Sequence, residues 1–202
     1  MRKFLTVLVT FGAIALLGAC GASGGSSDGA SDDSTTTEAP AKTTTTKPAV
    51  TVDAWAASFC GSFGTWLDEI KAASSEVGGQ VTPGDLESAQ TAIADLFGTA
   101  SGATQTLIDD IEGAGDPDIE DGDQLVDDLI TKFEAFDSAA QDAKADTEAL
   151  ATEDFDTFQA EADELTTRFQ DEVDKVADSF GEIDTKYPSE ELSDALVSSC
   201  DF

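Results

Sequence analysis

The most regular apolar pattern of this chain lies in residues 155–183, which spell FDTFQAEADELTTRFQDEVDKVADSFGEI. Apolar side chains recur there at steps of three and four, and they are Phe155, Phe158, Ala162, Leu165, Phe169, Val173, Val176, Phe180 and Ile183. Such steps place side chains on one stripe of an α-helix, and their near-regular alternation suits helix packing in a bundle. The segment therefore predicts a long amphipathic helix that is capped by Thr152 and ended by Gly181 and Pro188.

The segment from Val52 to Val77 carries a similar stripe that is rich in aromatic residues. Its apolar positions are Trp55, Phe59, Phe63, Trp66, Ile70 and Val77. We expect a helix here that is capped by Thr51 or Asp53 and stops at Gly78-Gly79. An aromatic stripe at helical spacing is typical of a core, and the alternative is that these rings line a pocket for an apolar ligand.

Two further helices are predicted between these segments. The first begins with Thr82 as N-cap and Pro83 in the first helical position, and its stripe continues to Ile111. Within it, Gly98 and Gly102 either admit a neighbouring helix at close range or bend or break the helix. The second begins near residue 119 or 123 and continues to residue 150.

A short fifth helix is predicted from Ser189 to Cys200, with acidic residues at its start that favour the helix dipole. From residue 52 onward no stretch alternates apolar and polar residues for long, so no strand is expected. The predicted fold is all-α: an up-down-up-down four-helix bundle over residues 52–202, with the short fifth helix tied back by a disulfide.

The first twenty residues have the three-part structure of a secretory signal. Two basic residues follow Met1, an apolar run extends to Leu17, and the small residues Gly18 and Ala19 precede Cys20. Leu17-Gly18-Ala19-Cys20 resembles the lipobox of bacterial lipoproteins. That resemblance implies cleavage after residue 19, a diacylglycerol on the Cys20 sulfur and acylation of the new N-terminus. The expected location is the extracytoplasmic face of the cell membrane, where the lipid holds the protein.

Residues 20–51 are predicted to be a lipidated, disordered tether. Gly, Ser, Thr and Pro dominate this segment, and it has no apolar periodicity with which to form a core. A flexible coil of roughly 30 residues has an r.m.s. reach of about 30 Å, which is enough to hold the helical domain clear of a bilayer. Sugar on the threonine runs and a bare linker are both compatible with this composition.

The net charge of the chain is strongly negative, and this limits the classes of partner that it can bind. The chain has 42 acidic and 10 basic residues, and removing Arg2 and Lys3 with the signal takes the net charge from −32 to −34. Such a charge repels phosphate backbones and anionic lipid headgroups, so nucleic acid is excluded as an expected partner. Cations, basic proteins and other envelope proteins stay compatible with the charge.

Three cysteines are accounted for once the lipobox resemblance assigns Cys20 to lipid. Cys60 and Cys200 then form one candidate disulfide in an oxidising compartment. The alternative is a pair of buried free thiols. A reactive thiol is disfavoured because the chain has no Cys-x-x-Cys motif and no histidine to lower its pKa.

The absence of histidine also removes the commonest general base and most transition-metal sites, so we expect no enzymatic activity and no resident cofactor. A weak calcium site is a hypothesis for the acidic segment 116–123, whose candidate ligands are Asp116, Asp118, Glu120 and Asp123. This segment has Asp121 where an EF-hand loop requires Gly, and it has Asp127 where that loop requires Glu. An acidic turn that caps the next helix is the competing interpretation.

The Asn-free and His-free composition, rich in Ala, Asp and Thr, resembles that of uncharacterised lipoproteins of actinobacteria. The expected function is that of a membrane-anchored binding or accessory protein of the cell envelope. The alternative is a surface protein that binds a small ligand or a divalent cation, which a cavity between the helices would favour. A carboxylate-based hydrolase is the least favoured alternative, because it would require a cleft with converging carboxylates.

Overall fold

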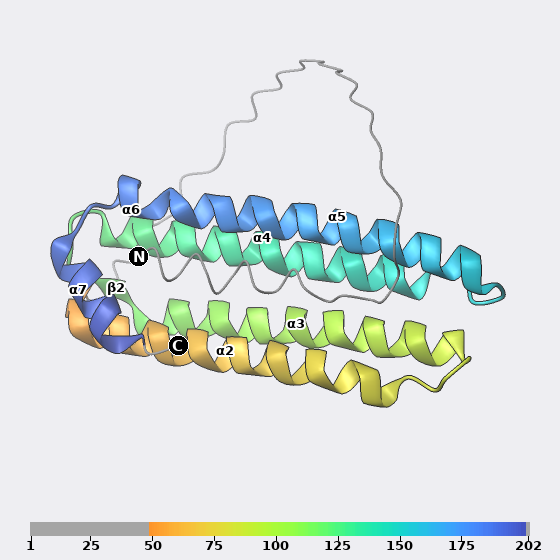
Figure 1. Ribbon diagram of the computed structural model, residues 1–202. Coiled ribbons are helices and arrows are strands. Elements are labelled where there is room, and N and C mark those ends of the chain that lie inside the picture. Colours follow the sequence, from red (N-terminus) through yellow and green to blue (C-terminus); the bar gives the residue numbers. More distant parts are fainter. Residues whose placement is uncertain (1–48, 201–202) are drawn as a thin grey trace, which may run out of the picture.

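The computed structural model describes residues 49–200 of the chain. Four long helices pack antiparallel, and they are α2 (Val52–Gln80), α3 (Leu86–Ala114), α4 (Gly122–Glu148) and α5 (Phe155–Gly181). One turn, α6 (Ile183–Lys186), and a short helix, α7 (Glu190–Ser199), complete the chain at one end of the bundle (Figure 1). The prediction of an all-α bundle with a fifth helix is confirmed. Cys20, the predicted signal and most of the predicted tether lie outside the described residues.

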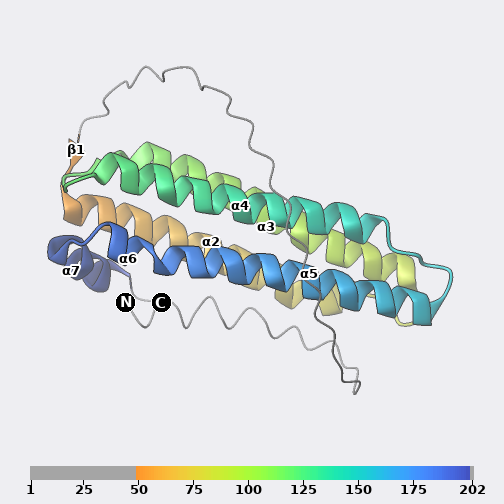
Figure 2. The same ribbon diagram turned by 90° about the horizontal axis from the view of Figure 1, so that it is seen from above.

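The helices pack in sequence order, α2 against α3, α3 against α4 and α4 against α5. Seen from above, α3 and α4 lie on one side while α2 and α5 lie on the other (Figure 2). Direct contacts between α2 and α5 are sparse, so the seam between the first and last long helices is the loosest of the bundle. None of the helices within residues 49–200 is long and apolar enough to cross a membrane.

A disulfide joins Cys60 of α2 to Cys200, which directly follows α7, and this confirms the predicted pairing. The two Cα atoms are 5.0 Å apart although 140 residues separate them in the sequence. The bond holds α7 against the first half of α2, where the two helices pack closely. The C-terminal helix therefore covers only the part of the bundle beside the start of α2.

Three predicted helix boundaries are wrong by a few residues. The N-cap of α3 is Asp85, whose carboxylate accepts a hydrogen bond from the Ser88 N–H at 3.1 Å, and not Thr82. Residues 82–84 form a turn in which Gly84 has a φ of 82°, so Pro83 precedes the helix. The N-cap of α5 is Asp154 and not Thr152, and α2 continues through residues 78 and 79 to Gln80. In each case the acidic side chain or the tertiary packing of the helix outweighed a local sequence signal.

The expectation of no strand is wrong at one short position. Residues Ala49–Val50 (β1) pair in parallel with Asp116–Pro117 (β2), and the Asp118 N–H donates to the Val50 carbonyl at 2.8 Å. This two-residue ladder was not predictable from alternation, because two residues cannot show a period. It fixes the start of α2 beside the α3–α4 connection, and it places the end of the predicted tether on the folded domain.

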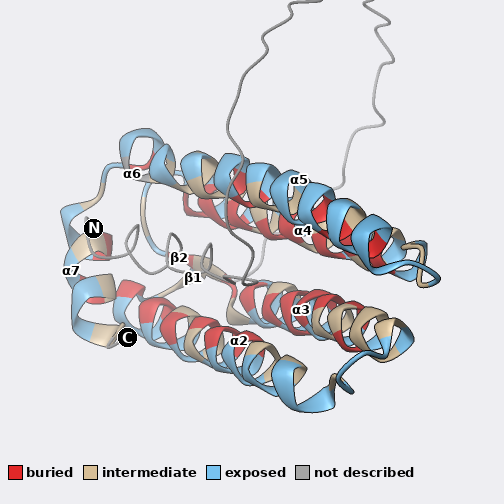
Figure 3. Cartoon of the chain, turned by 45° about the vertical axis from the view of Figure 1, so that its right-hand side comes forward, coloured by how far each residue is buried: buried red, intermediate tan, exposed pale blue. Residues whose placement is uncertain are grey.

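The core lies between the buried faces of the helices (Figure 3). Trp55, Phe59 and Phe63 stack along α2, with ring centroids 5.3 and 5.7 Å apart, and Phe133 of α4 meets Phe63 across the core. The Trp55 indole donates to the Gly115 carbonyl at 3.1 Å, which satisfies its buried N–H. Most of the aromatic stripe of the first helix is therefore core, as its spacing predicts.

The glycines within α3 neither bend nor break it, because the helix is continuous from residue 86 to 114. A Cβ on Gly98 would lie 3.4 Å from the Lys144 side chain of α4, which is ordinary contact, and a Cβ on Gly102 would meet no atom within 4 Å. Neither glycine is required for a close approach of helices.

Candidate apolar ligand-binding cavity

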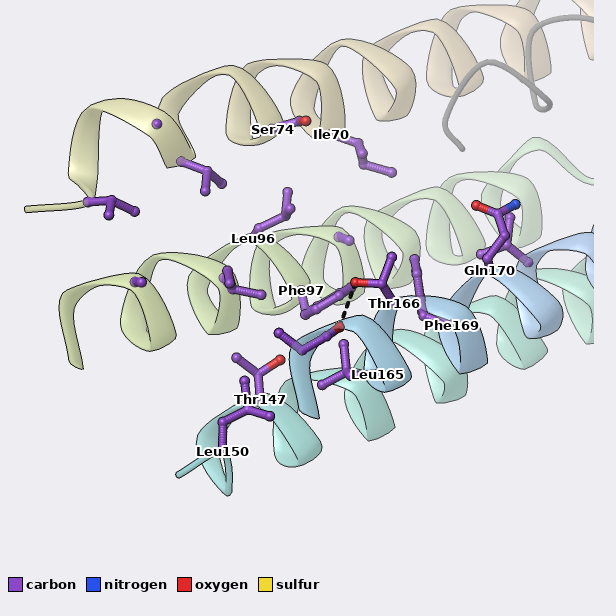
Figure 4. A pocket seen from close by; sticks show the side chains of 18 of the residues that line it. Ile70, Ser74, Leu96, Phe97, Thr147, Leu150, Leu165, Thr166, Phe169 and Gln170 are labelled. Carbon is purple, nitrogen blue, oxygen red and sulfur yellow. Dashed lines mark hydrogen bonds between the residues drawn. The ribbon is translucent and has the colours of Figure 1, made fainter. Parts of the chain in front are cut away.

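A cavity of about 450 Å³ lies between the four long helices. It occupies the half of the bundle that contains the α2–α3 and α4–α5 connections, at the opposite end from α7 (Figures 1 and 4). Each long helix supplies side chains to its wall, for example Ile70 from α2, Ile93 from α3, Phe136 from α4 and Leu165 from α5. This volume is in the range of small-molecule sites in proteins.

The length of α7 explains where the cavity lies. With 10 residues α7 is about 15 Å long, whereas the 29 residues of α2 extend about 43 Å. The short helix therefore covers only part of the loose seam between α2 and α5. In the part that α7 does not reach, small residues face the space from several helices, among them Gly78, Ala89, Ala100 and Ala162. Small side chains on loosely packed helices leave space that larger side chains would fill.

The inner end of the cavity is closed by aromatic rings. The buried rings of Trp66 and Phe136 meet edge to face with centroids 5.5 Å apart, and the buried Phe97 ring meets the half-buried Phe169 ring in the same way at 4.9 Å. The Trp66 Nε1–H donates to the Thr104 hydroxyl at 2.9 Å, so the polar edge of the indole is satisfied within the core. The inner wall therefore presents hydrocarbon to the cavity and no unsatisfied donor.

The outer end of the cavity is formed by apolar side chains that are only half-buried. They lie in the last turns of α2, in the first turns of α3 and just beyond the ends of α2 and α4, and they include Val77, Val81, Ile93, Leu96 and Leu150. The cavity wall is thus partly exposed at the distal end of the bundle, here called its open end, and also along the α2–α5 seam, where Thr166 is exposed.

No charged residue is among the lining side chains of this cavity, and its polar ones are few. Thr147 and Thr166 donate their hydroxyl hydrogens to the carbonyls of Ala143 and Ala162 in their own helices, at 2.7 and 2.8 Å (Figure 4). The Gln170 amide donates to Asp174 Oδ1 at 2.9 Å. These groups donate hydrogen bonds within their own helices and not toward the cavity. The wall is therefore suited to an apolar ligand.

A polar cluster lies at the other end of the bundle, close to α6. The Asp128 carboxylate of α4 accepts hydrogen bonds from Lys186 Nζ at 2.6 Å and from the Tyr187 hydroxyl at 2.7 Å. These two bonds hold the pKa of Asp128 below its usual value. The bond to Asp128 raises the pKa of Lys186, and burial raises the pKa of Tyr187. The cluster ties the α6 turn to α4 and is remote from the cavity.

The candidate calcium ligands lie in and around the α3–α4 connection. Asp116 belongs to β2, Asp118 and Glu120 are exposed in the turn that follows, and Asp123 is in the first turn of α4. Within residues 49–200, no group of three or more His, Cys, Asp or Glu side chains has a geometry that could hold a metal ion. The segment forms an irregular turn in which Asp121 adopts the left-handed conformation, and calcium binding there stays a prediction.

The aromatic stripe on α2 was expected either to form core or to line a pocket, and its residues differ in which of the two they do. Trp55 and Phe63 lie in the core away from the cavity, whereas Trp66 is both a core residue and part of the cavity wall. The cavity residues on α3, α4 and α5 were not predicted as a site, because in sequence they read as ordinary core positions. The feature that marks the cavity is that small residues of different helices face one another across the seam. This can be recognised only when it is known which helices pack together.

Comparison of the chain with protein-family models, curated proteins and solved structures finds no match. The fold and the cavity therefore define the chain as an all-α bundle with an apolar interior site.

Proposed function

We propose that this protein binds a small apolar ligand in the cavity between its four long helices, and that it does so while held by lipid on the extracytoplasmic face of the membrane. The cavity carries the proposal, because it is the feature that distinguishes a ligand carrier from a bundle used only for support. The lipobox-like motif at Cys20 and the signal-like residues before it support the location.

Binding of a small ligand is favoured over a function limited to binding a protein partner. Within residues 49–200, the exposed large hydrophobic residues are Phe155 at 63% in the first turn of α5 and Val197 at 64% in α7. These two positions are at opposite ends of the bundle, so they do not form a continuous apolar surface. Transfer of the ligand to an envelope partner is compatible with the proposal.

The proposed role is binding without catalysis. No titratable side chain lines the cavity, and the cluster around Asp128 lies at the far end of the bundle. A reaction at a ligand in the cavity would lack an acid, a base or a charged group to stabilise a transition state.

The binding test uses the chain from residue 20 onward with Cys20→Ser, which retains every described residue and removes the predicted acylation site. N-Phenyl-1-naphthylamine, an uncharged probe that fluoresces in apolar surroundings, is expected to bind saturably at one site per chain. Ala162→Phe fills the cavity from α5 and should abolish this binding. Ala160→Phe makes the same change at an exposed position of the same helix and should leave binding intact.

Two results would refute the proposal: no saturable binding by the parent chain, or equal binding by Ala162→Phe and the parent. Circular dichroism of both variants establishes that each is folded before binding is compared. The location is tested separately by metabolic labelling with palmitate, which should mark the wild-type chain and not Cys20→Ala.

A further inference from the structure

We infer that the ligand is an amphiphile with one linear hydrocarbon chain, whose headgroup is uncharged or cationic and stays at the open end of the cavity. This inference rests on the proposed function and adds the chemical class of the ligand. Three properties of the cavity lead to it: its proportions, the polarity gradient along its axis and the charge around its open end.

The cavity is elongated along the bundle axis. Its lining runs from Trp66 on α2 to Val81, which directly follows α2, and from Phe158 to Val173 on α5, which corresponds to about 22 Å along the axis in each case. An apolar space of this length matches one extended or gently bent hydrocarbon chain that lies along the bundle axis.

Polarity changes from one end of the cavity to the other. At the closed end Trp66 and Phe136 offer ring carbons, and the indole N–H is already bonded to Thr104. A headgroup placed there would lose its hydration without gaining a hydrogen-bond partner, which is unfavourable. The hydrocarbon end of the ligand therefore enters first, and the headgroup stays where the half-buried residues Val81 and Leu150 meet solvent.

The surroundings of the open end are acidic. Asp85 caps α3, Asp154 caps α5, and Glu153 is exposed in the α4–α5 connection. The nearby cation Lys144 is paired with Glu148 at 2.6 Å, so its charge is compensated. A carboxylate or phosphate headgroup at this end would meet like charges and no available cation in the cavity wall. An ammonium headgroup would be attracted there, and a hydroxyl would be tolerated.

The test compares lauryl alcohol, lauryltrimethylammonium and laurate, which share one chain and differ in headgroup, each below its micelle concentration. The reporter is the chain from residue 20 onward with Cys20→Ser and Trp55→Phe, in which Trp66 is the remaining tryptophan and lines the cavity. Above neutral pH laurate is ionised. Displacement of N-phenyl-1-naphthylamine from the chain that keeps Trp55 provides a second readout.

The alcohol and the ammonium probe are expected to change Trp66 fluorescence saturably, and laurate is expected to bind about tenfold more weakly or worse. Added salt should narrow the gap between laurate and the ammonium probe because it screens the acidic surroundings. Ala162→Phe should lose the binding of all three probes, and Ala160→Phe should retain it. Retained binding of the ammonium probe by Ala162→Phe would show attraction to the acidic surface and would overturn the inference.

The outcomes separate the inference from the proposed function. Laurate that binds as tightly as the alcohol overturns the headgroup assignment, and pyrene that binds more tightly than the alcohol overturns the linear chain. In both cases the cavity still binds an apolar ligand and the proposed function stands. If the parent binds none of the probes, the proposed function itself fails.

Discussion

The indole nitrogen of Trp66 lies 2.9 Å from the hydroxyl oxygen of Thr104, and this hydrogen bond joins α2 to α3 at the closed end of the cavity. Thr104 is fully buried, and its own hydroxyl hydrogen is donated to the Ala100 carbonyl at 2.7 Å. One threonine thus satisfies the polar edge of a large ring whose remaining surface is apolar. The pair allows a tryptophan to line an apolar cavity without leaving a buried donor unsatisfied.

Thr104→Val removes the acceptor while retaining the shape of the side chain, so the Trp66 N–H becomes a buried donor without a partner. We expect the free energy of unfolding to fall by roughly 1–3 kcal/mol. Thr106→Val is the matched control, because the Thr106 hydroxyl bonds to Gly102 of the same helix at an exposed position. Urea unfolding of both variants measures the difference, and equal losses would contradict the role given to Thr104.

The disulfide between Cys60 and Cys200 is expected to stabilise the fold strongly, because it closes a loop over a sequence separation of 140 residues. The chain-entropy estimate for such a loop is about 4–5 kcal/mol. Reduction, or the double substitution Cys60→Ala with Cys200→Ala, should therefore lower the melting temperature markedly while the far-ultraviolet spectrum remains helical.

Thiol labelling checks the same bond in the chain with Cys20→Ser. No thiol should react after denaturation without reductant, and two should react after reduction. Labelling of two thiols without reductant would contradict the bond.

Asp128→Asn should destabilise the protein by about 1 kcal/mol near neutral pH, because the hydrogen bonds from Lys186 and Tyr187 favour the ionised carboxylate. The pKa of Asp128 is lowered in the folded state, so its contribution is present above the ordinary value of 3.8. The contribution is lost as the pH falls through the lower folded-state pKa. The difference between variant and parent should therefore shrink in acid, as measured by unfolding at several pH values.

Asp127→Asn, at the exposed neighbouring position, controls for the loss of one negative charge from a strongly acidic protein. A difference that persists unchanged at the lowest pH would contradict the assignment of this effect to the Asp128 carboxylate.

Gly122→Ala should be strongly destabilising, because a Cβ at this position would lie on the Pro117 carbonyl oxygen. That oxygen belongs to the backbone of the α3–α4 connection, so relief requires the start of α4 to move, at a cost of roughly 2 kcal/mol or more. Gly102→Ala is the contrasting variant, since its Cβ would meet no atom within 4 Å. Alanine there should stabilise α3 by roughly 0.5–1 kcal/mol. Thermal melts of the two variants should shift in opposite directions.

Much of the fold follows from apolar spacing. Steps of three and four in residues 155–183 give α5 its extent, and glycines lie at or near the ends of α2, α3 and α5. The helix starts were harder to predict, because several residues near each start have capping side chains. Asp85 and Asp154 accept the capping hydrogen bonds, and neighbouring threonines had the same local signal. The β1–β2 pair was not predictable, because it joins residues more than sixty positions apart.

The candidate site was predictable only in part. Trp66 stands out in sequence as a large aromatic residue, and a pocket beside the stripe of α2 was one of two interpretations. Ile93, Phe97 and Leu165 have the same spacing as residues that fill the core elsewhere, so nothing local marks them as cavity walls. Their role depends on how far each helix lies from the next, which is a property of the packed bundle.

The sequence by itself determined that the described domain is helical and acidic and has two cysteines available for one bond. Apolar period, charge and cysteine count are properties of the chain that need no knowledge of its packing. Only the tertiary structure decided that α7 is too short to cover the whole α2–α5 seam and that the uncovered part encloses about 450 Å³. A cavity is space left between elements, so its position and shape arise from their relative placement and not from any one segment.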